Sequence, residues 1–99
     1  MKNLIIQLDK AFESRVRLGI MALLLVNETV EFNTLKAELQ VSDGNLASHL
    51  SGLEKAGYLL VNKQFIGKKP NTTYRATAAG KEAFNKHLNI LEQIIQQRN

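Results

Sequence analysis

Residues 42–59 read SDGNLASHLSGLEKAGYL, and this stretch decides the fold. Ser42 belongs to the residue types that cap helix N-termini, and Gly57 can take the left-handed conformation that ends a helix. Between them, leucines recur at steps of four and three, which predicts a helix over about 43–56 with one apolar stripe. The opposite side of this helix is small and polar, and its members are Gly44, Asn45, Ser48, Ser51, Gly52 and Lys55.

A longer apolar pattern precedes this segment. From residue 12 to residue 26, apolar side chains follow three- and four-residue steps, as in a helix buried along one face. Ser14 is one candidate for its N-cap, and Asp9 is another, about one turn earlier. The apolar residues Leu4, Ile5 and Leu8 predict an N-terminal extension that packs elsewhere in the molecule.

A short strand and a short helix are predicted between these two helices. Residues 30–32 alternate between apolar and polar side chains, which favours a strand. Asn33 is a candidate N-cap for a helix of about 34–40, because its side-chain oxygen can accept hydrogen bonds from the first free amides. Phe32 can pack over the start of that helix as a hydrophobic staple.

The residues after Gly57 favour a β-hairpin followed by a last helix. Residues 58–65 and 72–76 are rich in strand-forming side chains, and a turn is predicted at 67–71 between them. Thr77 is a candidate cap for the last helix, which we expect to extend to about residue 97.

Composition bounds the class of protein. The chain has 99 residues, 44% of them hydrophobic and 22% charged, so we expect a single globular domain over 1–99. No apolar run approaches the ~18 residues of a membrane span, and no signal segment is recognisable, so a soluble cytoplasmic protein is expected. With no cysteine and two histidines, no disulfide, metal site or cofactor is expected.

The basic residues are unevenly distributed. The formal net charge is +4. Residues 1–54 carry five cations against seven anions, whereas residues 55–86 carry seven cations against Glu82 alone. A basic excess confined to one stretch is typical of an element that faces a polyanion such as the phosphate backbone of DNA. The alternative is a solvated charge cluster that only keeps the protein soluble.

The order of these elements, helix, short strand, helix, tight turn, capped helix, basic hairpin and long helix, is that of a winged helix-turn-helix. The segments FNTLKAEL (32–39), VSDGNLASHL (41–50) and LEKAGYL (53–59) resemble those of the MarR/ArsR-like transcriptional regulators, in particular their stand-alone winged-helix DNA-binding domains. RLGIM (17–21) and YRATAAG (74–80) extend the resemblance over roughly residues 8–88.

The resemblance implies a mainly α fold of the α+β class. Its parts are a helix-turn-helix at about 33–56, a wing at about 58–76 and a C-terminal dimerisation helix at about 77–97, added to a three-helix core. It also implies a homodimer that binds a palindromic duplex DNA operator. The chain departs from the family at Ser48, where Arg or Lys is frequent, and at Gln40, where glycine is common. Because of the first departure, the predicted helix over 43–56 carries fewer cations for phosphate contacts, and the wing is expected to supply them.

Two surfaces of such a regulator would meet DNA. The predicted helix over 43–56 would enter the major groove, where Asn45 can pair with adenine, and the lysines of the hairpin tip would contact the backbone or minor groove. The main role of Asp43 is predicted to be stabilisation of the helix dipole. The candidate DNA-binding residues are Ser42, Gly44, Asn45, Ser48, His49, Lys55, Lys63, Lys68, Lys69, Asn71 and Arg75.

A single module reads only ~4 to 5 base pairs, so two copies are expected to act together. The last helix carries a broad apolar stripe that can pair with its symmetry mate, and the N-terminal extension can join it. The alternative is that this stripe covers only its own core. The candidate dimer-interface residues are Leu4, Ile5, Leu8, Phe84, Leu88, Leu91, Ile94 and Ile95.

Two other classes of function are alternatives to a DNA-binding regulator. A winged helix can serve as a protein-interaction module without DNA binding, in which case the apolar stripe would be the working surface. An enzyme is not expected, because no nucleophile, base and orienting group recur at useful spacing and no phosphate-binding glycine loop is present. The sequence does not indicate an effector ligand, the operator or the direction of regulation.

Overall fold

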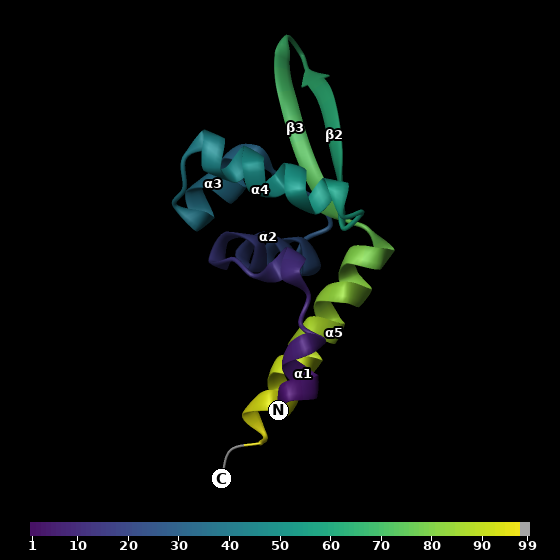
Figure 1. Cartoon of the computed structure of the whole chain (residues 1–99). Helices are drawn as coiled ribbons and strands as arrows, with labels where there is room; N and C mark the ends of the chain where they lie inside the picture. Colours follow the sequence, from purple (N-terminus) through teal and green to yellow (C-terminus); the bar gives the residue numbers. More distant parts are fainter. Residues whose placement is uncertain (98–99) are drawn as a thin grey trace.

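The computed structural model describes residues 1–97 and confirms the predicted winged-helix fold of the α+β class. The elements in chain order are α1 (Lys2–Ile6), η1 (Lys10–Phe12), α2 (Arg15–Val26), β1 (Val30–Glu31), α3 (Phe32–Leu39), α4 (Asp43–Lys55), β2 (Leu59–Ile66), β3 (Lys69–Ala76) and α5 (Ala78–Ile95). Helices α2, α3 and α4 form the body, and the hairpin of β2 and β3 rises from it as the wing (Figure 1). On the other side of the body, α5 projects away with α1 beside it; we call this pair the stalk.

Both candidate caps near the N-terminus are used. The Asp9 side chain accepts from the amide of Ala11 at 2.9 Å and begins η1. Ser14 Oγ accepts from the amide of Val16 at 3.2 Å and caps α2, which begins at Arg15 as this candidate cap implied, while Phe12 at the start of the apolar pattern belongs to η1. The predicted N-terminal extension is helical and forms α1, which packs against α5.

The prediction that Asn33 caps the next helix is wrong. Helix α3 begins at Phe32, with Glu31 in the N-cap position and no side-chain cap hydrogen bond. The reason is tertiary: Val30 pairs with Tyr74 of β3, and the rings of Phe32 and Tyr74 lie 6.4 Å apart, so the chain enters the helix where it leaves the sheet. The predicted strand is correspondingly one residue shorter.

The prediction for α4 is confirmed at its start. Ser42 Oγ accepts from the amide of Asn45 at 3.1 Å. Gly57 follows the helix with φ of +81°, the left-handed conformation expected of it. Gln40, which ends α3, also has a left-handed backbone, with φ of 53°, at the position where glycine is common in the family.

The wing spans the predicted residues, but its second strand, β3, is longer and its turn tighter than predicted. Strands β2 and β3 pair from Leu59↔Ala76 to Ile66↔Lys69, which leaves Gly67 and Lys68 as a two-residue turn. The predicted turn at 67–71 is wrong, since residues 69–71 belong to β3. Gly67, with φ of +65°, supplies the positive φ that two-residue hairpin turns require. With β1 pairing only at the base of β3, the sheet order is β1-β3-β2.

The core lies between the helices of the body and the base of the wing. Leu35 of α3, Leu46 and Leu53 of α4 and Leu59 of β2 are fully buried there against α2. The other members of the buried apolar cluster are Phe12, Val16, Ile20, Met21, Leu24, Val30, Leu50, Tyr74 and Phe84.

The start of α5 is fixed to the loop between α4 and β2. Thr77 Oγ1 accepts from the amide of Gly80 at 2.9 Å, as predicted for a cap, and donates to the carbonyl of Gly57 at 2.7 Å. The Thr77 amide donates to the Tyr58 carbonyl at 3.0 Å. Gly80 lies against the same Tyr58 carbonyl, where a Cβ atom would collide with the oxygen. The direction of the stalk is thus set by backbone contacts.

Candidate nucleic-acid interface

Helix α4 presents one polar face to solvent. Its buried residues are Leu46, Leu50 and Leu53, as the leucine spacing predicted. The predicted DNA-binding residues that are exposed on or beside this helix are Ser42, Gly44, Asn45, Ser48 and Lys55. Ala47 is exposed as well and was missed, because alanine was counted as apolar. Its position next to Ser48 on the helix would have shown it, and its methyl group can contact the methyl group of thymine.

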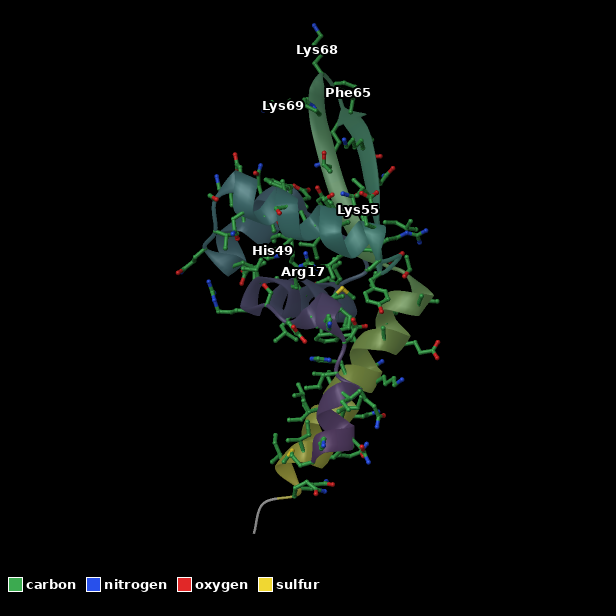
Figure 2. All side chains as sticks on the ribbon, viewed as in Figure 1. Arg17, His49, Lys55, Phe65, Lys68 and Lys69 are labelled. Carbon is green, nitrogen blue, oxygen red and sulfur yellow. The ribbon has the colours of Figure 1, made fainter. Side chains whose placement is uncertain are left out.

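His49 and Gly52 face the molecule more than the solvent. Arg17 of α2 donates from Nε to His49 Nδ1 at 3.0 Å and from Nη1 to the Ala11 carbonyl at 3.4 Å. Its guanidinium group lies against Gly52, where a Cβ atom would collide with it. The prediction that Gly52 is turned outward is therefore wrong, because Arg17 occupies the space beside it. Figure 2 shows Arg17 and His49 between α2 and α4.

The acceptor role of His49 Nδ1 fixes the tautomer of the ring. A neutral imidazole carries one proton, so an unprotonated Nδ1 leaves the N–H on Nε2 as a donor. His49 itself is half-buried. Arg17 thus acts as a positioning residue beneath α4.

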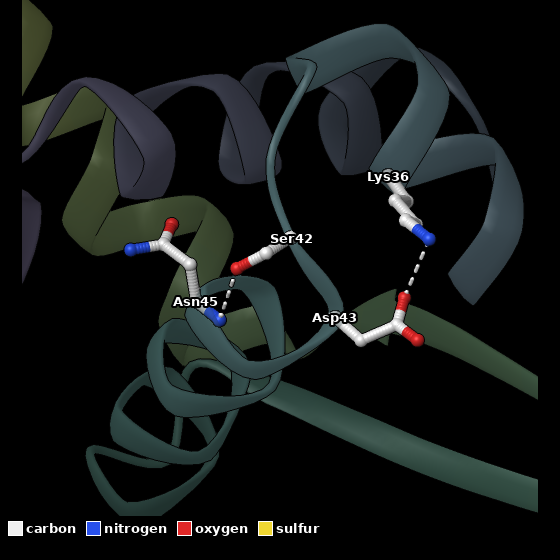
Figure 3. A network of polar contacts seen from close by, with 4 residues as sticks. All are labelled: Lys36, Ser42, Asp43 and Asn45. Atoms are coloured by element: carbon white, nitrogen blue, oxygen red, sulfur yellow. Dashed lines mark hydrogen bonds and ion pairs between the residues drawn. The ribbon is translucent and has the colours of Figure 1, made fainter.

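The first turn of α4 is tied to α3 (Figure 3). Lys36 Nζ lies 2.9 Å from Asp43 Oδ1, and the Ser42 cap closes the same turn. Asp43 lies in the first turn, where a carboxylate stabilises the helix dipole as predicted. The pair is exposed, so its contribution to stability is small, ~0.2–1 kcal/mol. Its electrostatic effect is to offset the negative charge of Asp43 at the exposed start of α4.

The wing carries cations without any carboxylate. Residues 59–76 contain Lys63, Lys68, Lys69 and Arg75 and no Asp or Glu, and all four side chains are exposed. Lys68 lies in the turn at the outermost point of the wing, with Lys69 beside it (Figure 2). The whole wing is therefore electropositive, which favours contact with a polyanion.

Lys63 and Arg75 lie on opposite faces of the wing. Side chains alternate between the faces of a strand, so Lys63 shares a face with Val61 and, across the ribbon, Thr72. Arg75 lies opposite Leu60 on the other face. Lys63 lines a groove of about 400 Å³ with the half-buried Asn71 and the start of α3. Arg75 lines a separate hollow on the outer face of the sheet.

The stalk leaves three of the eight predicted dimer residues exposed and four half-buried. Ile5, Leu88 and Ile95 are exposed, and Leu4, Leu8, Leu91 and Ile94 are half-buried. Phe84 differs, since it is 4% exposed and its ring meets Phe12 of its own core edge to face at 5.3 Å. Ile6, which is 74% exposed, adds to the apolar surface and was not among the predicted residues. Its place in the apolar run 4–8 is the signal that could have found it.

A polar and aromatic cluster joins the stalk to the body. The Tyr58 hydroxyl donates to Asp9 Oδ2 at 2.5 Å, and the Asp9 amide donates to Nδ1 of the buried His87 at 3.1 Å. Phe12 stacks on Tyr58 with ring centroids 5.2 Å apart. The hydrogen bond to Asp9, with desolvation and the charge of Asp9, raises the pKa of Tyr58 to about 12.

No group of three or more His, Asp or Glu side chains among residues 1–97 is arranged to hold a metal ion. No helix among the described elements is long and apolar enough to cross a membrane.

Comparison with known proteins supports the same class. A family model described as a winged helix DNA-binding domain matches residues 16–95. The uncharacterized protein MJ0432 of Methanocaldococcus jannaschii is 39% identical over 85 residues, which is 86% of this chain and 92% of that protein.

Solved structures agree. A transcriptional regulator homologue from Pyrococcus horikoshii OT3 is 31% identical, with a TM-score of 0.87 over 98% of this chain and 97% of that one. The structure of ytfH from Salmonella typhimurium is 27% identical, with a TM-score of 0.72 over 90% of this chain and 85% of that one.

The exposed polar face of α4, the basic wing and these matches define one class of protein. The chain belongs to the winged helix DNA-binding domain family, and the resemblance to MarR-like transcriptional regulators is confirmed. The Pyrococcus horikoshii structure is described as a transcriptional regulator homologue, and the Salmonella typhimurium structure as a putative transcriptional regulator.

Proposed function

We propose that this protein is a homodimeric transcriptional regulator that binds a palindromic duplex DNA site, with α4 in the major groove and the wing on the adjacent backbone or minor groove. The observation that carries the proposal is the pairing of an exposed polar α4 face with an acid-free basic wing at one end of the molecule, away from the stalk (Figure 1).

The α4 face suits base recognition. Asn45 can form a bidentate pair with adenine, and Ser42, Ser48 and the Nε2–H of His49 can donate to bases or phosphates. Gly44 leaves the backbone of the first turn unobstructed, since nothing lies within 4 Å of where its Cβ would be. The helix offers short side chains, so close approach to the groove floor is possible.

The wing supplies the charge that α4 lacks. Lys55 ends α4 and is the sole cation among its residues 43–55, whereas Lys63, Lys68, Lys69 and Arg75 belong to the wing. Each cation that neutralises a phosphate releases a counterion, which makes binding salt-dependent. Asn71 adds a neutral donor on β3 for a phosphate or sugar contact.

The stalk is the surface through which we propose that two copies pair. Two half-sites about one helical turn apart require two α4 helices at a fixed distance. We propose that the exposed apolar residues of α1 and α5 pair across a two-fold axis and so fix that distance. We also propose that the protein acts in the cytoplasm, where the chromosomal DNA of archaea and bacteria lies.

The decisive experiment is selection of bound sequences from a random duplex pool with the purified chain. The expected result is an enriched inverted repeat with half-site centres about 10 base pairs apart, or a multiple of that spacing. The affinity for the selected duplex should fall steeply with salt. If no sequence is enriched and no salt-sensitive DNA binding occurs, the proposal fails in favour of a protein-interaction module.

A further inference from the structure

The wing carries exposed apolar side chains next to its lysines. Phe65 is 73% exposed and Ile66 is 61% exposed, at the end of β2 just before the turn. Phe65 lies directly opposite the exposed Pro70 of β3 in the strand register, so the two rings share one face of the ribbon. Figure 2 shows Phe65 close to Lys68 and Lys69 at the end of the wing farthest from the body.

These rings have no role in the fold. The hydrophobic core ends at Val61 and Tyr74 near the base of the wing. Val61 lies four residues before Phe65 on β2, and Tyr74 lies four residues after Pro70 on β3. The stalk, which holds the other large exposed apolar surface, lies at the opposite end of the molecule (Figure 1). A second copy that pairs through the stalk therefore leaves Phe65 uncovered.

The surroundings of Phe65 select a polyanionic partner. Lys63 lies two residues earlier on the same face of β2, and Lys68 and Lys69 follow in the turn and at the start of β3. No carboxylate interrupts residues 59–76. Lys69 pairs with Ile66 and therefore lies on the opposite face of the ribbon from Phe65. An apolar ring with cations along the same ribbon suits a ligand that has charged walls and an apolar floor, which is how the minor groove of DNA presents its phosphates, sugars and stacked bases.

We propose that Phe65 and Pro70 form an apolar wedge that enters the minor groove beside the α4 site and bends the duplex toward the major groove. The inference rests on the proposed function and adds a DNA deformation to it. The minor groove of B-form DNA is about 6 Å wide, whereas two paired strands lie ~4.8 Å apart before their side chains are added. The wing tip can therefore enter only where the groove opens, and an apolar wedge that partly unstacks one base step opens it.

The wedge makes recognition depend on sequences that α4 does not touch. Pyrimidine–purine steps unstack most easily, so we expect such a step in the selected site at the place where the wing tip lies. The lysines hold the flanking phosphates, and Phe65 converts that contact into a bend. Charge and bend are thus assigned to different side chains and can be separated by substitution.

The test uses the selected duplex with a donor and an acceptor fluorophore at its ends. Affinity, salt slope and bend angle are measured for the wild type, Phe65→Ala, Phe65→Leu and the control Val26→Ala, whose parent side chain is 78% exposed on α2 outside the wing. The wild type should bend the duplex within the ~20–90° range of minor-groove wedges. Phe65→Ala should lose most of the bend and bind about fivefold or more weakly, with an unchanged salt slope because no charge is lost. Phe65→Leu should keep part of the bend, and Val26→Ala should match the wild type.

Two outcomes would contradict the wedge, and a third would contradict the proposed function itself. If the wild type binds the selected duplex and Phe65→Ala bends and binds it identically, the wedge fails while the proposed function stands. The wedge also fails if Phe65→Ala leaves the bend intact but abolishes binding to phosphatidylglycerol vesicles, since the rings would then serve an anionic lipid surface. If the wild type selects no duplex, the proposed function itself fails. Unchanged thermal unfolding of the variants shows that their folds are equal.

Discussion

Arg17 of α2 donates a 3.0 Å hydrogen bond to His49 of α4, so a helix of the body holds the helix that is proposed to meet DNA. The same guanidinium group reaches the Ala11 carbonyl and fills the space beside Gly52. One side chain therefore joins α2 to the neighbouring η1 and to α4, where His49 lies 32 residues further along the chain.

Arg17→Ala should destabilise the fold by about 1–2 kcal/mol, because it leaves a half-buried acceptor on His49 without its donor. Arg15→Ala is the matched control, since Arg15 is exposed on the same helix. It should change stability by less than ~0.5 kcal/mol. The measurement is urea unfolding followed by circular dichroism. Equal stability of the two variants would contradict the anchoring role of Arg17.

Replacing Lys68 and Lys69 together by alanine should weaken binding to all duplex sequences alike. If both contact phosphates, the slope of log affinity against log salt should become shallower by about 1.8, at ~0.9 for each lost contact. The control is Lys2→Ala with Lys86→Ala, two exposed lysines of the stalk that give the same change in net charge. A titration series from low to high salt checks this. An unchanged slope would remove the wing from DNA binding.

Asn45→Ala should lower discrimination at one base-pair position by ~1–3 kcal/mol. The fold should survive, because the Ser42 cap bonds the backbone amide of residue 45 and not its side chain. The control is Asn89→Ala on α5, which is equally exposed. Competition between the selected site and single-base variants measures the effect. Equal losses on selected and random duplexes would make Asn45 a phosphate contact.

Leu91→Glu and Ile95→Glu should each convert the protein to monomers, because a carboxylate would be buried in an apolar interface. Ile95 is 57% exposed, so its substitution tests pairing without disturbing the core of the chain. Native mass spectrometry of each variant, with Val26→Glu as control, gives the oligomeric state. Dimers that persist in both variants would place the interface elsewhere.

Tyr58→Phe should destabilise the protein by about 1–2 kcal/mol near neutral pH, because the phenol donates to the charged Asp9. The pKa of Tyr58 is raised from 10.0 to about 12 in the folded protein. The contribution of this proton is fully present below pH 10 and is lost as the pH rises toward 12. The stability difference between wild type and variant should therefore shrink across that window, and urea unfolding at several pH values measures it. A difference that does not change with pH would contradict this.

Local signals explain what the sequence predicted well. Caps act within three residues, so Ser42 and Thr77 located the starts of α4 and α5 directly. The leucine spacing of α4 identified its buried stripe, and through that stripe most of its exposed face.

Features decided by distant residues were not predictable in the same way. Asn33 has the chemistry of a cap, yet the pairing of Val30 with β3 starts the helix earlier. Pro70 was interpreted as a turn residue, but it belongs to the part of β3 beyond the reach of β1, where a missing amide proton is tolerated. Gly52 had the spacing of an outward residue, and nothing in its neighbourhood along the chain indicated that Arg17 would fill its side.

The joint at Thr77 and Gly80 has a geometric consequence. Contacts with the carbonyls of Tyr58 and Gly57 hold the start of α5 at a fixed angle to the body. The stalk and the body are therefore expected to move as one unit. In any dimer assembled through two such stalks, a small rotation at the axis would be magnified into a large displacement of the two bodies. The spacing between the two half-sites that such a dimer can bind would then depend on the angle between α5 and the body, which is set at residues far from the proposed DNA contacts.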